Sequence, residues 1–175
     1  RFAVRLDVCG AGISLWPHQS EGATRMSDIG ETEARAARQK DRLLQLGALL
    51  FLLGLLSGLV TGLMANPRMG LSAHMQGLTN GTFLLAAGAV WDRVNLGPRT
   101  KAAAFWALAF GTSANWLMTQ LAALWGTGQM TPIIGAGHAG ADWQEMVVSA
   151  GLLALTLAML AGAALLLAGL LRRAN

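Results

Sequence analysis

The sequence predicts an all-α protein: a four-helix transmembrane bundle with both termini in the cytoplasm. Three observations point to this fold class. Hydrophobic residues make up 54% of the 175 residues and charged residues only 13%, whereas a soluble domain carries about 25% charged residues. Four long stretches contain no Asp, Glu, Lys or Arg, and the basic residues gather in alternate connections between them.

The same composition excludes other classes of protein. The 13 Lys and Arg residues are too few for a surface that tracks nucleic-acid phosphates, so we expect no nucleic-acid partner. Cys9 is the only cysteine, and a lone cysteine excludes a scaffold of internal disulfides. The expected surroundings are therefore a lipid bilayer.

The four uncharged stretches predict the four helices in order. They are residues 43–66, 71–90, 102–125 and 146–171. Each reaches the length of about 20 residues that crosses about 30 Å of hydrocarbon. Backbone groups in lipid must be paired within the segment, and the runs lack the alternation of barrel strands, so helices are expected. The second stretch is the least apolar, because it carries His74, Gln76, Thr79, Asn80 and Thr82.

The connections between these stretches predict the orientation. Basic residues on one side are Arg35, Arg38, Lys40, Arg42, Arg93, Arg99, Lys101, Arg172 and Arg173. The other side has Arg68 and a long loop, 126–142, without Lys or Arg. An excess of Lys and Arg marks cytoplasmic connections, which places both termini there. Trp91, Trp125 and Trp143 fall at predicted helix ends, where indole rings favour the headgroup level.

The chain divides into two parts by pattern. Residues 1–41 are expected to be a leader followed by an amphipathic basic lead-in, and residues 42–173 the four-helix membrane domain. The first 25 residues lack periodicity and a clean apolar core, so they do not resemble a signal peptide. We expect the natural start to be Met26, and we assign no function to Cys9 or His18.

Glycines at four-residue spacing predict close helix contacts. Gly54, Gly58 and Gly62 share a face of the first helix, and Gly77 and Gly81 repeat the spacing in the second. Small residues let membrane helices approach each other closely. His74 lies on the same face as Gly77 and Gly81. Two hypotheses follow for His74: the glycines leave a slot for a planar ligand held by the imidazole, or His74 makes an interhelical hydrogen bond.

Buried amides form the second candidate feature. Gln76 and Asn80 are four residues apart, and Thr112, Asn115 and Thr119 line one face of the third helix. We expect Asn80 and Asn115 to meet across a shared cavity, where amides orient a substrate oxygen without adding charge. The alternative is that they only join helices through hydrogen bonds.

The loop before the fourth helix offers weaker signals. Gly135, Gly137 and Gly140 match the spacing of a dinucleotide fingerprint, but no strand precedes them, so that function is rejected. We interpret the segment as a mouth loop with His138 at the interface. Glu145 is expected to cap the start of the fourth helix rather than act as an acid or base.

Several of these motifs resemble the hydroxylaminobenzene mutases. The similar runs are Asn66 to His74, Gly77-Leu-Thr-Asn80-Gly81, the Gly111 to Trp116 segment and the loop from Pro132 to His138 with Trp143 to Glu145. The resemblance covers roughly 42–171. It implies a small isomerase of the bacterial inner membrane that converts hydroxylaminobenzene, a small aromatic substrate, to 2-aminophenol.

A more distant resemblance is to the styrene oxide isomerases. Their helix-two histidine, six residues before Asn-Gly, binds a ferric haem b that acts as a Lewis acid. Carried over, this makes His74 the axial ligand, with Gly77 and Gly81 beside the cofactor. It makes Asn80 the substrate-orienting amide, supported by Asn115. Gly111 and Thr119 stand where that family has an acid and a tyrosine, so the site chemistry must differ in detail.

The expected enzyme holds a substrate N–O oxygen near His74 and the amides Asn80, Asn115 and Gln76, with Thr119 alongside, and works as a trimer or dimer. Two other classes remain as alternatives. One is a haem- or quinone-binding protein without catalysis, although His74 is the only histidine within a predicted span. The other is a small transporter of apolar compounds.

Overall fold

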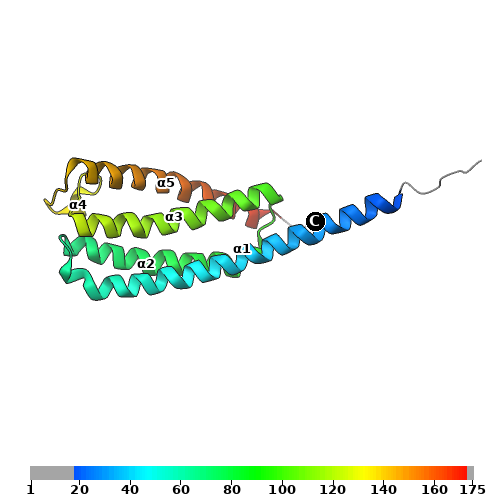
Figure 1. The fold of residues 1–175 in the computed structure, drawn as a ribbon, viewed down its shortest axis with the longest axis horizontal. Helices are drawn as coiled ribbons and strands as arrows, with labels where there is room; N and C mark the ends of the chain where they lie inside the picture. The colour runs from blue at the N-terminus through cyan, green and yellow to red at the C-terminus, as the bar shows by residue number, and fades with distance from the viewer. Residues whose placement is uncertain (1–17, 173–175) are drawn as a thin grey trace, which may run out of the picture. The chain divides into compact units, whose positions relative to one another are not determined.

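The computed structural model describes the backbone of residues 18–172 and the side chains of residues 30–172. This part of the chain is helical and contains no strand, which confirms the predicted all-α class (Figure 1). The elements are α1 His18–Val60, η1 Thr61–Leu63, α2 Pro67–Ala89, η2 Trp91–Arg93, α3 Pro98–Trp125, α4 Pro132–Gly135 and α5 Asp142–Leu171.

The chain separates into two compact units, Arg1–Ala34 and Arg35–Asn175. All four predicted membrane segments belong to the second unit, and the packing described below lies within it. Residues 1–17 lie outside the described part, so the leader and the start at Met26 remain predictions.

The helices begin earlier than the uncharged stretches. α2 starts at Pro67 and α3 at Pro98, each with proline at its first position, where the missing N–H costs nothing. Asn66 caps α2 by accepting a hydrogen bond from the backbone N–H of Met69 at 3.1 Å. Arginine favours helices, so Arg68 and Arg99 lie inside them. The uncharged stretches therefore predicted the apolar part of each helix but not the residue at which the helix begins.

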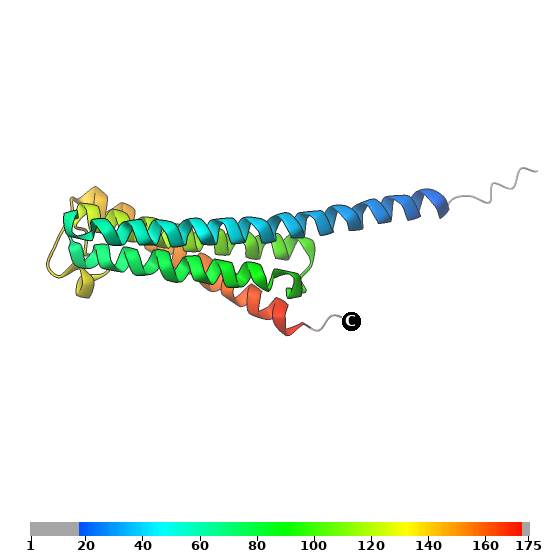
Figure 2. The same cartoon turned by 90° about the horizontal axis from the view of Figure 1, so that it is seen from below.

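α1 and α2 lie side by side through their glycines (Figure 2). A Cβ added at Gly54 would lie 2.7 Å from the backbone N of Leu78, and one at Gly58 would lie 2.6 Å from His74 Nδ1. Both distances are far below ordinary contact of about 3.5–4.0 Å. The predicted packing role of Gly54 and Gly58 is confirmed, whereas Gly62 has no neighbour within 4 Å.

α3 packs on both α2 and α5. At the contact with α5, methionine side chains fill the space that glycine leaves. A Cβ at Gly111 would lie 2.7 Å from Met159 Cγ, and one at Gly151 would lie 2.7 Å from Met118 Cγ. Side chains therefore cover the glycines of this interface, Met118 and Met159 at two of them and Leu108 at Gly162, in contrast to the backbone contacts between α1 and α2.

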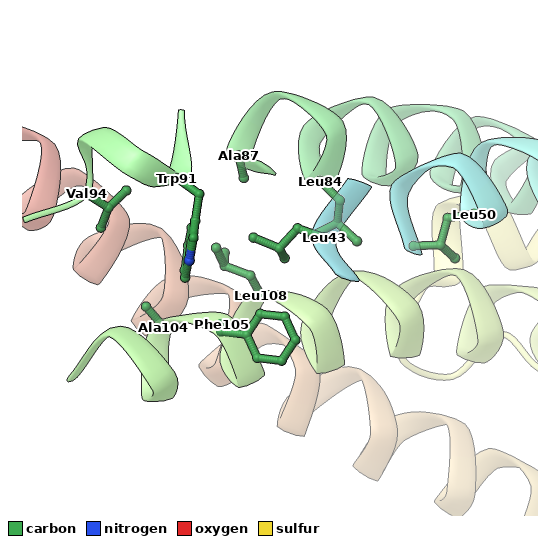
Figure 3. Packing of buried hydrophobic residues seen from close by; sticks show 9 residues of the cluster. All are labelled: Leu43, Leu50, Leu84, Ala87, Trp91, Val94, Ala104, Phe105 and Leu108. Atoms are coloured by element: carbon green, nitrogen blue, oxygen red, sulfur yellow. The ribbon is translucent and has the colours of Figure 1, made fainter. Parts of the chain in front are cut away.

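A cluster of apolar side chains fills one end of the unit (Figure 3). Trp91 is fully buried there, with its ring centroid 6.5 Å from that of Phe105 in an edge-to-face arrangement. Trp91 lies at a helix end as predicted, but its ring is enclosed by the core and does not face the surroundings. Lys101 donates to the carbonyl of Val94 at 3.0 Å beside that ring. Its burial lowers the pKa of the ammonium, and Asp92 partly opposes this.

Two helices of the described part are long and apolar enough to cross a membrane by length and composition: Gly30–Leu63, with 34 residues, and Asp142–Leu171, with 30. α2 and α3 are long enough but less apolar, since polar side chains interrupt their apolar runs. Those polar side chains gather at the site described next.

Candidate active site

A cavity of about 410 Å³ lies between α2, α3, α5 and the segment around α4. This volume is within the usual range for small-molecule sites. Gln76, Asn115 and Thr119, three of the four predicted catalytic residues, line it. Apolar side chains of α5, among them Leu155 and Met159, form the facing wall. The cavity thus joins an amide-bearing wall to an apolar one.

Hydrogen bonds link three amides from α2 and α3. Asn80 Nδ2 donates to the backbone carbonyl of Thr112 at 3.3 Å and to Gln76 Oε1 at 3.5 Å. Asn115 Nδ2 donates to the same Gln76 oxygen at 2.8 Å. Asn80 and Asn115 are therefore linked through Gln76, whereas the expectation was that they meet directly across the cavity. Asn80 is only 6% exposed and lies behind the residues that line the cavity.

The backbone carbonyl of Thr112 determines which way all three amides point. A carbonyl only accepts hydrogen bonds, so the NH₂ of Asn80 must face it. The same NH₂ group of Asn80 also donates to Gln76, so the oxygen of Gln76 must face Asn80. That oxygen also accepts from Asn115, so the NH₂ group of Asn115 must face Gln76. Gln76 Nε2 and Asn115 Oδ1 are left with no hydrogen-bond partner among the described residues, and neither is sealed from solvent. The cavity therefore receives one free donor and one free acceptor.

The threonine hydroxyls are bonded to their own helix. Thr119 Oγ1 donates to the carbonyl of Asn115 at 2.7 Å, and Thr112 Oγ1 donates to that of Leu108 at 2.7 Å. Such back-bonding is ordinary for threonine within a helix. The hydroxyl proton of Thr119 is thus already used, and its oxygen lone pairs remain as an acceptor at the cavity.

His74 faces α1 and not this cavity. Its Nδ1 lies 2.8 Å from the carbonyl oxygen of Gly54. Because that oxygen only accepts, Nδ1 carries the proton, and Nε2 keeps a lone pair. Nε2 has no hydrogen-bond partner among the described residues, and the ring is partly exposed. An imidazole held by a backbone carbonyl at one nitrogen is the usual arrangement of a metal-binding histidine.

The slot predicted over Gly77 and Gly81 is filled by α1. A Cβ added at Gly77 would lie 2.7 Å from the backbone N of Gly54, and one at Gly81 would lie 2.6 Å from that of Phe51. The expectation that these two glycines leave room for a planar ligand is therefore wrong. Their small size serves the close approach of the two helices. A planar group held by His74 would have to lie on the partly exposed side of the ring.

His74 and the amides lie on different sides of α2. Two residues along a helix correspond to about 200° around its axis, and His74 contacts Gly54 of α1 while Gln76 contacts Asn115 of α3. Within one chain, the histidine and the amides thus do not form the shared site that the sequence suggested.

Glu145 holds the loop before α5. Its carboxylate is 9% exposed and accepts hydrogen bonds from the backbone N–H groups of Gly128, Gln129 and Gly140, each at 3.0 Å. The expected cap of the helix start is instead supplied by Gln144, whose Oε1 accepts from the N–H of Ala141 at 2.8 Å. Glu145 therefore organises the loop rather than the first turn of α5.

Sequence reasoning missed the second function of Asn66. Besides capping α2, its fully buried side chain donates to the carbonyls of Ile134 at 3.2 Å and Gly135 at 3.0 Å. Asn before Pro signals a helix cap, but contacts 68 and 69 residues away leave no local signature.

Comparison with known proteins agrees with the resemblance described above. The family model of styrene oxide isomerase matches residues 39–171, most of the chain. The chain belongs to the styrene oxide isomerase family.

Two relatives carry the hydroxylaminobenzene mutase name. Hydroxylaminobenzene mutase HabB of Ectopseudomonas oleovorans is 51% identical over 140 residues, 79% of this chain and 84% of the relative. Hydroxylaminobenzene mutase HabA of the same organism is 46% identical over 127 residues, 72% of this chain and 94% of the relative. The chain is accordingly an enzyme of the isomerase class. No solved structure gives a significant match.

Proposed function

We propose that this chain is an integral membrane isomerase that converts arylhydroxylamines of the hydroxylaminobenzene type to 2-aminophenols. One observation carries the proposal: the hydrogen-bonded side-chain amides leave a free donor on Gln76 and a free acceptor on Asn115 at one largely apolar cavity. An arylhydroxylamine offers the complementary pair, an oxygen that accepts and an N–H that donates, attached to an apolar ring.

The reaction is an isomerisation, so its atoms and electrons balance within the substrate. The N–O bond breaks, a C–O bond forms at the ortho carbon, and the ortho proton is lost as a proton adds to nitrogen. Gln76 Nε2 donates to the substrate oxygen and stabilises the charge that develops there as the N–O bond lengthens. Asn115 Oδ1 accepts from the substrate N–H, which orients the nitrogen. The apolar wall of α5 holds the ring.

His74 would hold a haem b through its Nε2, which has no hydrogen-bond partner among the described residues, on the partly exposed side of the ring. His74 Nε2 would bind the iron, while the Gly54 carbonyl holds the ring through Nδ1. Ferric iron would supply Lewis acidity toward an oxygen bound on the His74 side of α2, which is not the side of the amide cavity.

The haem proposal is tested on the purified full chain by its absorption spectrum. We expect a Soret band that His74→Ala abolishes and that His138→Ala keeps, because His138 is an exposed loop residue. A wild-type protein that is active without a Soret band would remove haem from the proposal. An unchanged band in His74→Ala would remove the ligand assignment.

The exposed side chains of α5 support a membrane location. Leu153, Leu157, Leu160 and Leu167 are each more than half exposed on a helix of 30 residues. In water such a surface is a liability, whereas in lipid it is the expected one. We infer four spans in a bacterial inner membrane, with both termini cytoplasmic and the chains assembled as dimers or trimers. Carbonate-resistant fractionation, labelling of single cysteines at both ends and light scattering in detergent test these three statements.

The proposed activity is tested by incubating the detergent-purified full chain with hydroxylaminobenzene and measuring 2-aminophenol by chromatography. Gln76→Leu removes the donor and is expected to lower kcat/KM by about 100-fold, as loss of one donor to a developing oxyanion does. Thr79→Val is the matched control, because Thr79 is an exposed residue of the same helix. Wild-type turnover in Gln76→Leu would contradict the proposed role. No product from the wild type would contradict the proposed function.

A further inference from the structure

We propose that Ile134 limits the length of the para substituent that the cavity accepts, and that Asn66 is the positioning residue that keeps Ile134 in place. This inference rests on the proposed function and specifies which arylhydroxylamines the site takes.

The cavity extends along the helices between two different ends. On α2 its lining runs from Gln76 to Met69, and on α3 from Asn115 to Ala122. Both distances are seven residues, or about 10 Å of helix. Gln76 and Asn115 supply the free donor and acceptor at one end, and Ile134 belongs to the other. A bound arylhydroxylamine thus directs its N–O group to the amides and its para position toward Ile134.

An unsubstituted ring does not fill this length. The path from the nitrogen to the para carbon is about 4 Å with bond lengths of about 1.4 Å. The hydrogen bond to Gln76 takes about 3 Å more of the length, so about 3 Å remain before the end at Met69 and Ile134. A para substituent of about two carbon atoms fits this space by the same bond lengths. Longer substituents meet the Ile134 side chain.

Asn66 fixes the position of that end wall. Its side chain donates to the carbonyls of Ile134 and Gly135 and accepts from the N–H of Met69. Its backbone N–H donates to the carbonyl of Ala123 at 3.0 Å. One fully buried residue therefore ties together α2, the end of α3 and α4. Met69 and Ile134 both line the cavity, so Asn66 sets their separation.

The chain offers a matched pair of variants for the test. Ile134 lines the cavity and is 37% exposed, whereas the adjacent Ile133 is 85% exposed and does not line it. We measure kcat/KM for hydroxylaminobenzene and its 4-ethyl and 4-butyl derivatives with wild type, Ile134→Ala and Ile133→Ala. Ile134→Ala is expected to raise the ratio of 4-butyl to unsubstituted substrate by at least 10-fold. Ile133→Ala is expected to leave that ratio unchanged.

A second pair of variants tests Asn66 as a positioning residue. In Asn66→Asp the carboxylate still accepts from the Met69 N–H but has no proton to donate to the two loop carbonyls. We expect this variant to raise KM about 10-fold with kcat within about 3-fold, and to widen the range of accepted lengths. Asn66→Ala loses all three side-chain hydrogen bonds, and its melting temperature reports their joint contribution to stability. If Asn66 were only a cap, Asn66→Asp would keep the wild-type KM and length preference.

The outcomes separate this inference from the proposed function. If the wild type converts hydroxylaminobenzene but its length preference is the same in Ile134→Ala, or shifts equally in Ile133→Ala, the assignment of Ile134 is overturned alone. If the wild type converts no arylhydroxylamine, the proposed function fails first. A length preference that Ile134→Ala alone widens supports both.

Discussion

Replacing Asn80 with leucine separates a residue that touches the substrate from one that acts through a neighbour. Asn80 donates to the Thr112 carbonyl and to Gln76 Oε1, and it does not line the cavity. Its expected effect on catalysis passes through the orientation of Gln76. The role implied by family resemblance is different, because it makes Asn80 the amide that orients the substrate directly.

The size of each effect follows from the contacts that are lost. Asn80→Leu removes one hydrogen bond between α2 and α3, to the Thr112 carbonyl, and one within α2, to Gln76, which costs about 1–2 kcal/mol of folding free energy. It leaves Gln76 held only by Asn115, so the amide reverses more freely. We expect kcat/KM to fall about 10-fold, which corresponds to about 1.4 kcal/mol. Gln76→Leu removes the donor itself and lowers it about 100-fold.

A double-mutant cycle decides between the two roles. If Asn80 acts only through Gln76, the double variant Asn80→Leu with Gln76→Leu has the same kcat/KM as Gln76→Leu alone. The assay is initial 2-aminophenol formation by the detergent-purified proteins, with melting temperatures to correct for unfolded fractions. Thr82→Val, at an exposed position of α2, is the control. Additive losses of kcat/KM, about 1,000-fold in the double variant, would refute an action of Asn80 through Gln76 alone. They would indicate that Asn80 contacts the substrate directly.

Two further predictions concern folding. Gly77→Ala is expected to lower the free energy of unfolding by about 1–3 kcal/mol, because the added Cβ meets the backbone of Gly54. Gly62→Ala is the control: its added Cβ has no neighbour within 4 Å, so the same thermal scan should show unchanged stability. Glu145→Gln replaces an acceptor oxygen with an NH₂ that repels the loop N–H groups. Limited proteolysis should then cut the loop at least several-fold faster than in wild type, and an unchanged rate would show that the carboxylate does not hold it.

The helical class and the amides were accessible from sequence for the same physical reason. Apolar runs that avoid charge over 20 or more residues leave few structures other than helices. Against such a background each polar side chain stands out, and Gln76, Asn115 and Thr119 all line the cavity. Asn80 was found by the same signal, although its distance from the cavity depends on helix rotation, which residue spacing along one helix does not determine.

The errors arose where one residue type serves two environments. A glycine pair shows that something approaches closely, but the sequence does not distinguish a ligand from the backbone of α1 beside Gly77 and Gly81. A tryptophan at a helix end suits both the lipid headgroups and a core, and Trp91 lies in the core. The contacts of Asn66 with the loop were not predicted, because its partners, Ile134 and Gly135, are distant in sequence.

The two helix contacts on either side of the cavity walls, α1 with α2 and α3 with α5, differ in their tolerance to mutation. Between α1 and α2, backbone meets backbone, and even one added methyl group has no space to enter. Between α3 and α5, Met118 of α3 and Met159 of α5 can adopt other rotamers when their neighbours change. Mutations that change substrate preference should therefore be tolerated better on α5. A larger side chain there displaces a methionine side chain and does not separate two helices.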